Sequence, residues 1–191
     1  MDAIQFEENV LEPHGLLPRF CGTWVNDPDI EEVACKLGAD LPSQLDASWQ
    51  ETEEGQLLVD RFGDWTLALE RDTRRGADRH ILRSLSSTSL SAVNIWWDVN
   101  GVSSLTYGAN GRILAKFELA LGAREHWTGE DPRALDRYLD DLPLGMATAN
   151  DSDCRFAAFV LIKKMTGIML NSEWLGDEHP CYTFQYRRDQ L

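Results

Sequence analysis

The chain has 191 residues, with 18 basic and 32 acidic side chains, a net charge of −14 and a hydrophobic fraction of 43%. This length suits one well-cored domain, and the apolar fraction argues against wholesale disorder. No stretch approaches the roughly 18 apolar residues of a membrane span, and the first residues do not resemble a signal peptide. The negative charge argues against nucleic acid or an anionic membrane as the main partner, because both attract clustered Lys and Arg.

The four cysteines are scattered along the chain and form no C-x-x-C pair; they are Cys21, Cys35, Cys154 and Cys181. Their spacing fits neither a structural zinc site nor a thioredoxin-type redox site, and four are too few for a disulfide framework. We therefore expect four reduced thiols in a cytoplasmic protein.

Residues 28–37 are predicted to form the first helix. Asp27 is a good N-cap, Pro28 suits the first helical position and Gly38 suits a left-handed stop. The stripe at i, i+3, i+4 and i+7 that would dock on a core consists of Ile30, Val33, Ala34 and Leu37. The polar residues 39–55 that follow are expected to form a loop.

Residues 56–62 and 65–69 are predicted to be two strands of a hairpin that turns at Gly63-Asp64. In the second strand the large apolar residues alternate with smaller or polar ones, which predicts that one face is buried. A helix over 78–85 is expected next, before a serine-rich break.

Residues 93–99 have the strongest strand pattern in the chain, and two Asn-Gly turn signals follow, at Asn100-Gly101 and Asn110-Gly111. Both dipeptides are typical of type I′ turns, so residues 93–119 are predicted to form a three-strand antiparallel meander. Together with the hairpin, this gives a sheet of about five strands.

The last third is predicted to be mainly helical. Asp131-Pro132 starts one expected helix, and residues 153–166 form a second, apolar on nearly every side and ending at Gly167. A short turn over 172–175 and a last strand over 182–186 complete the pattern. We predict a single α+β domain over 1–191, with N- and C-terminal helices packed on an antiparallel sheet and with 1–20 and 187–191 at the periphery.

Several stretches resemble, in the same order, an uncharacterised and mostly actinobacterial family known as a domain of unknown function. They are GDWTLALE at 63–70, WDVNGVS at 97–103, GRILAKFE at 111–118, residues 161–175, and the early Trp24 with LGAD at 37–40. The resemblance extends from about Cys21 to Leu175 and implies a single soluble bacterial α+β domain. No activity is assigned to that family, so no catalytic residue is carried over.

The sequence contains no G-x-S-x-G, H-E-x-x-H, P-loop or G-x-G-x-x-G motif. No catalytic residue and no cofactor are therefore predicted. The segment Asp177-Glu178-His179-Pro180-Cys181 gathers carboxylate, imidazole and thiol groups that zinc accepts, but it offers no second ligand pair. We interpret it as a surface loop and predict no metal site.

Five arginines and two aspartates lie between residues 71 and 83. If the helix extends back far enough, Arg75, Arg79 and Arg83 form one cationic ridge that fits a carboxylate or phosphate, such as a nucleotide or an acidic patch on a partner. The alternative, which we favour, is a solvated face paired with the protein's own acidic groups.

Trp96 is predicted to lie on the opposite face of its strand from Val93, Ile95, Trp97 and Val99. It either packs under the C-terminal helices or forms a partly exposed platform for a partner, including a second copy in a homodimer.

The leading hypothesis from sequence is an acidic protein-interaction module, immunity- or inhibitor-like, that binds a basic protein partner with salt-sensitive association. The alternative is a small-ligand-binding protein or enzyme that holds an anionic ligand with the arginine ridge. A deep cleft lined by Arg, His and carboxylate groups would favour the alternative, and a flat acidic face would favour a partner.

Overall fold

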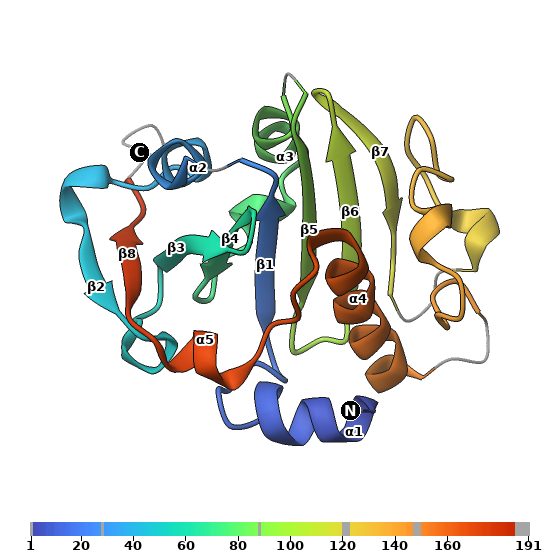
Figure 1. Ribbon diagram of the computed structural model, residues 1–191, viewed down its shortest axis with the longest axis horizontal. Coiled ribbons are helices and arrows are strands. Elements are labelled where there is room, and N and C mark those ends of the chain that lie inside the picture. Colours follow the sequence, from blue (N-terminus) through green and yellow to red (C-terminus); the bar gives the residue numbers. More distant parts are fainter. Residues whose placement is uncertain (1, 28, 88, 120–122, 147–149, 186–191) are drawn as a thin grey trace.

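An eight-stranded, entirely antiparallel sheet crosses the molecule in the order β2-β8-β3-β4-β1-β5-β6-β7 (Figure 1). The computed structural model describes residues 2–27, 29–87, 89–119, 123–146 and 150–185. The strands are β1 (Phe20–Val25), β2 (Leu45–Ala47), β3 (Gln56–Phe62), β4 (Trp65–Glu70), β5 (Ser91–Trp97), β6 (Ser103–Ala109), β7 (Arg112–Phe117) and β8 (His179–Thr183). The α+β class is confirmed, but the sheet has eight strands rather than about five.

Helices cover both faces of this sheet. The helices are α1 (Ala3–Phe6), a π-helical turn (Glu7–Leu11), α2 (Ile30–Leu37), α3 (Arg79–Leu85), α4 (Asp151–Thr166) and α5 (Ser172–Gly176). One buried cluster joins α1, α4 and α5 to the sheet, and a second joins α2 and α3 to the opposite face. Single 3-10 turns occur at Leu41–Ser43, Trp49–Glu51, Arg75–Ala77, Arg124–His126 and Asp136–Tyr138.

One of the strands that the sequence pattern did not predict, β1, lies at the centre of the sheet between β4 and β5. All six of its residues are buried, so it shows no alternation of polar and apolar residues. Strand β4 is also buried along its whole length, so both of its faces are covered, whereas its alternation predicted the burial of one face. The expected loop over 39–55 contains β2, and the last strand begins at His179 rather than at 182.

The predicted hairpin and meander are confirmed: β3 pairs with β4, β5 pairs with β6, and β6 pairs with β7. Asn110 and Gly111 both have positive φ, 52° and 72°, as a type I′ turn requires. The other Asn-Gly differs: Gly101 has a φ of 75° and donates to the Asp98 carbonyl at 3.1 Å, while the Asp98 amide donates to the Val102 carbonyl at 3.0 Å. This is a three-residue loop, not a type I′ turn.

The predicted helices form where the capping signals are strong. Helix α2 ends at Gly38 with a φ of 88°, but its N-cap is Asp29, not Asp27, and accepts from the Glu32 amide at 2.9 Å. Pro28 lies outside the described residues. Helix α3 is capped by Asp78, and α4 ends at Gly167 as predicted, with a φ of 85°.

The helix predicted after Asp131-Pro132 is wrong, because this segment consists of turns and the 3-10 turn Asp136–Tyr138. The backbone amides of Glu130 and Asp131 donate to the β7 carbonyls of Ile113 and Leu114, both at 3.0 Å, which ties the start of the segment to the sheet edge. Leu135 and Leu139 are nevertheless buried in the core.

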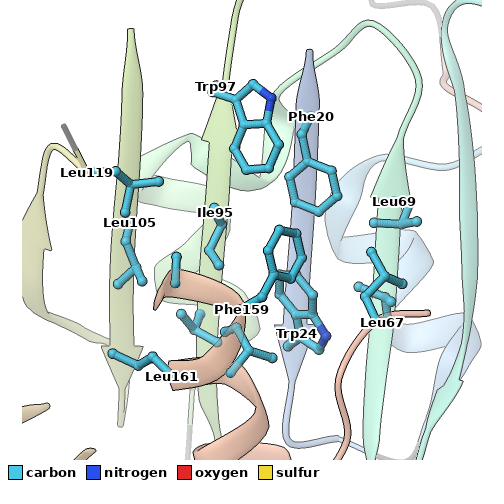
Figure 2. Close-up of a cluster of buried hydrophobic side chains, with 14 of the residues drawn as sticks. Phe20, Trp24, Leu67, Leu69, Ile95, Trp97, Leu105, Leu119, Phe159 and Leu161 are labelled. Atoms are coloured by element: carbon cyan, nitrogen blue, oxygen red, sulfur yellow. The ribbon is translucent and has the colours of Figure 1, made fainter. Parts of the chain in front are cut away.

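The main core forms around Phe159 of α4 (Figure 2). Its ring centroid lies 4.8 Å from that of Phe6, 5.3 Å from Phe20, 6.1 Å from Trp24 and 6.0 Å from Trp97. The first twenty residues are therefore not peripheral as expected: their buried members are Ala3, Phe6, Val10, Leu11, Leu16 and Phe20. Residues 187–191 lie outside the described part of the chain.

Candidate functional site

A pocket of about 350 Å³ opens at one end of the sheet. Strand β1 runs antiparallel to both β4 and β5, so its first residues lie beside the last residues of those two strands. The lining includes the side chains of Arg19, Trp49, Arg71, Asp72, Arg74 and Trp96. We call this the arginine–tryptophan pocket.

Two of its arginines lie over tryptophan rings. The Arg71 guanidinium carbon is 4.8 Å from the centroid of Trp49, and that of Arg74 is 4.7 Å from the centroid of Trp96. Trp49 is buried, and its indole N–H donates to the His14 carbonyl at 2.8 Å, which fixes the ring. A cation over an indole ring is attracted by the negative face of the ring, and the guanidinium N–H groups are the donors that pair with carboxylate or phosphate.

Two arginines of the pocket, Arg19 and Arg74, form only exposed ion pairs with carboxylates. Arg19 pairs with Asp72 at 3.0 Å, and Arg74 approaches Asp98 at 4.0 Å, with the Arg19 and Arg74 side chains 55% and 63% exposed. Exposed ion pairs of this kind contribute about 0–1 kcal/mol each. A ligand anion can therefore join or replace these carboxylates at little cost.

The loop that carries Arg71 and Arg74 is anchored on a buried carboxylate, Glu70. One of its oxygens accepts from the Thr73 hydroxyl and the Arg75 amide, both at 2.6 Å, and the other accepts from the Gly76 amide at 2.7 Å. Position 76 requires glycine because a Cβ there would lie 2.1 Å from the Thr23 hydroxyl oxygen. The loop conformation is thus fixed by contacts with β4 and β1.

Cys21 lies beneath this loop, with its thiol 3.3 Å from Glu70 Oε1. Burial, assisted by the Glu70 charge, raises the pKa of the Cys21 thiol well above its ordinary value. Burial also raises the pKa of Cys154, and it raises that of Cys181 to about 11. These three thiols therefore stay protonated at neutral pH and are not activated nucleophiles.

We expect a thiol reagent such as Ellman's reagent to modify one cysteine of the folded protein at pH 8, the exposed Cys35, and all four after denaturation. Unfolded thiols ionise near pH 9, whereas folded Cys181 keeps its proton to about pH 11. Its contribution to stability is therefore complete below pH 9 and is lost between pH 9 and 11. Modification of two or more cysteines in the native protein, measured at 412 nm, would contradict this assignment.

The predicted arginine ridge does not form, because Arg75 precedes α3 in a separate 3-10 turn. The Arg75 guanidinium lies 4.1 Å from the centre of the Phe184 ring, and Arg83 donates to the Gly111 carbonyl at 2.9 Å. Arg79 borders a different pocket. Ligand binding by these residues stays a prediction, but they do not act as one row.

Trp96 is half-buried, on the face of the sheet opposite α4. It therefore does not pack under the C-terminal helices, and the alternative of a partly exposed platform describes its position. Sequence reasoning missed two partners in the pocket, Arg19 and Trp49, because they come from segments 30 residues apart with no shared motif.

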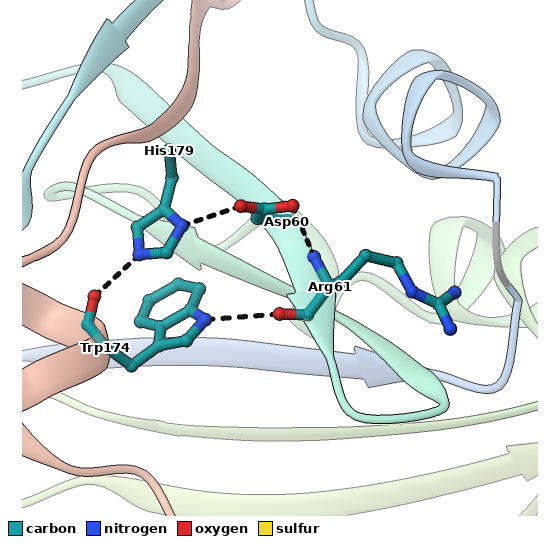
Figure 3. Close-up of polar contacts among 4 residues, drawn as sticks. All are labelled: Asp60, Arg61, Trp174 and His179. Atoms are coloured by element: carbon teal, nitrogen blue, oxygen red, sulfur yellow. Dashed lines mark hydrogen bonds and ion pairs between the residues drawn. The ribbon is translucent and has the colours of Figure 1, made fainter.

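The 177–181 segment is not a surface loop, since His179 and Cys181 are buried in β8. The His179 ring nitrogens lie 2.8 Å from an Asp60 carboxylate oxygen and 2.6 Å from the Trp174 carbonyl (Figure 3). The imidazole also stacks on the Trp174 indole, with ring centroids 4.0 Å apart. Both nitrogens thus have protein partners, and across the described residues no three metal-ligating side chains gather at one point.

Two pairs of acidic residues early in the chain lie far apart in the fold. Glu7 and Glu8 belong to the turn after α1, before the start of β1, whereas Glu31 and Glu32 belong to α2, which follows the end of β1. Figure 1 shows α1 and α2 at opposite ends of the sheet.

The fold and the pocket define a class: an α+β protein with one antiparallel sheet, covered on both faces, and an arginine-lined pocket at the sheet end. Within that class, a family model described as a family of unknown function, DUF6461, matches residues 19–183, and the chain belongs to this family. No curated protein and no solved structure matches the chain. In the described part of the chain, no helix is both long and apolar enough to cross a bilayer.

Proposed function

We propose that this protein binds a small anionic ligand in the arginine–tryptophan pocket. The observation that supports this most is the convergence of three arginine side chains, two of them with the guanidinium carbon over an indole ring, around a single cavity. Arginine and carboxylate side chains line this pocket, two of the three kinds of group expected of a ligand-binding cleft, while no histidine is among its described lining residues. Cavities of about 300–1,000 Å³ are typical of small-molecule sites.

The chemistry of the walls indicates the class of ligand. The guanidinium edges provide sites for a phosphate or carboxylate, and the two indoles provide flat apolar surface. A nucleotide combines an anionic group with a planar ring, and its size suits a cavity of about 350 Å³ that is open to solvent. A nucleotide is therefore the ligand that we propose to test first.

Replacing Arg74 by glutamine should weaken nucleotide binding about tenfold or more, because a charge-assisted hydrogen bond to an anion contributes about 1.5–3 kcal/mol. The measurement is isothermal titration calorimetry with AMP, ADP and ATP. R74K separates charge from shape, since lysine keeps the charge but loses the planar stack on Trp96.

Arg137 provides the matched control, because it makes the same kind of contact, 4.6 Å from the Tyr138 ring centroid, outside the pocket. R137Q should bind as tightly as the natural protein. A panel of nucleotides and acyl phosphates that neither binds nor raises the melting temperature would refute the proposal.

A basic protein partner is the second candidate function. Val99, which lines the pocket, and nearby Val102 are 60% and 46% exposed on the loop between β5 and β6. Trp96 is of a residue type enriched at interface hot spots, and the two valines extend the apolar surface beside it. The predicted immunity- or inhibitor-like role, the homodimer and the cytoplasmic location all stay predictions.

A further inference from the structure

A second pocket, of about 370 Å³, lies where α3 meets β6, β7 and residues 128–130. It shares no lining residue with the arginine–tryptophan pocket. Its lining includes Arg79, Thr106, Ile113, Lys116, Gly129 and Glu130.

The two cations of this pocket, Arg79 and Lys116, have no side-chain partner among the residues described by the structure. Other cations nearby are engaged: Arg83 donates to the Gly111 carbonyl at 2.9 Å, and Arg112 lies 3.5 Å from the Glu130 carboxylate. Arg79 and Lys116 are exposed cations in a chain of charge −14 and share the cavity with one carboxylate, Glu130, so the lining carries an excess of positive charge that attracts an anion.

The floor of the pocket is polar. Thr106 is buried on the α3 face of β6, opposite Asn94 of β5 in the register and two residues after Ser104. Asn94 Oδ1 and the Ser104 hydroxyl oxygen are buried and have no hydrogen-bond partner in the described part of the protein. Neither Asn94 nor Ser104 lines the pocket, so the hydroxyl group that its floor offers to a ligand is that of Thr106.

The outer wall is fixed to the sheet. Thr128 and Lys116 exchange backbone hydrogen bonds of 2.9 and 2.8 Å, and the Glu130 amide donates to the Ile113 carbonyl at 3.0 Å. Gly129 has a φ of 128°, and a Cβ at this position would lie 2.1 Å from the Leu114 carbonyl oxygen. The wall is therefore part of the folded structure and does not need a ligand to form it.

We propose that this second pocket binds a small phosphorylated polyol, such as a sugar monophosphate. The phosphate lies between Arg79 and Lys116, and the hydroxyl groups face the Thr106 side chain. No aromatic ring occurs among the described residues that line the cavity, which favours a polyol over the planar ligand proposed for the first pocket.

Isothermal titration calorimetry with glucose 6-phosphate, ribose 5-phosphate and glycerol 3-phosphate tests this proposal, with inorganic phosphate and glucose as reference probes. At least one sugar or polyol phosphate should bind, and inorganic phosphate should bind about tenfold more weakly. R79Q and K116Q should each reduce affinity about tenfold or more. T106V keeps the shape but removes the hydroxyl, so it should weaken sugar phosphate binding and leave phosphate binding unchanged.

Arg83, one turn further along α3, provides the matched control, and R83Q should bind as the natural protein does. The proposal is overturned if none of the three phosphates binds, or if R79Q and K116Q bind normally. Binding that is lost in R74Q but kept in R79Q places the ligand in the arginine–tryptophan pocket, which overturns this inference and supports the proposed function. Circular dichroism melting of each variant shows that the folded state is retained.

Discussion

Replacing Phe159 by alanine should lower the free energy of unfolding by about 3–5 kcal/mol, the range for deleting a fully buried phenylalanine. The ring is 0% exposed and is in contact distance of aromatic rings from α1, β1 and β5. Its removal leaves a cavity bordered by the large and rigid side chains of Phe20, Trp24 and Trp97, which cannot collapse into the space. Urea denaturation followed by tryptophan fluorescence measures the change.

Phe156 is the matched control, since it lies on the same helix, is only partly buried and has its ring centroid 5.7 Å from that of Phe6. F156A should lower the free energy of unfolding by about 1 kcal/mol, because the Phe156 ring is only partly buried and solvent fills the space that it leaves. Equal losses for the two variants would show that α4 does not pack through Phe159.

Replacing Glu70 by alanine should destabilise the protein by about 3–5 kcal/mol and also abolish ligand binding at the arginine–tryptophan pocket. The carboxylate is buried and accepts from the Thr73 hydroxyl and from the Arg75 and Gly76 amides, so its removal leaves these donors unpaired. Without this anchor the loop no longer holds Arg74 over Trp96.

Asp72, two residues later, is the control for Glu70. Its ion pair with Arg19 is exposed, so D72A should change stability by less than about 1 kcal/mol. Chemical denaturation gives the stability of both variants, and calorimetry gives their ligand affinity. A stable E70A variant that binds normally would contradict the role of this carboxylate as the anchor of the site.

Local signals in the sequence were reliable where a residue's own conformational preference determines its backbone dihedral angles. The positive φ values of Asn110, Gly111, Gly38 and Gly167 are local conformational preferences, and each one ends or reverses an element as predicted. In place of the helix expected after Asp131-Pro132, the amides of Glu130 and Asp131 bond to β7, and the amides that follow close single turns, such as that of Ala134 with the Asp131 carbonyl at 3.0 Å. Tertiary contacts there override a weak local preference.

The candidate site was only partly predictable. Trp96 and the basic stretch were recognised, but the sequence grouped Arg75, Arg79 and Arg83 on one helix that begins only at Arg79. The arginine that stacks on Trp96 is Arg74, which the Glu70 anchor places there.

The sequence by itself determined the α+β class, the hairpin, the meander and most helix ends, because these depend on neighbours within a few residues. Only the tertiary structure decided that β1 occupies the centre of an eight-stranded sheet, since a strand buried on both faces shows no alternation. The tertiary structure also forms both pockets. Distant strands and loops must pack together before Arg19, Trp49 and Arg74 meet in one pocket and Arg79 and Lys116 meet in the other.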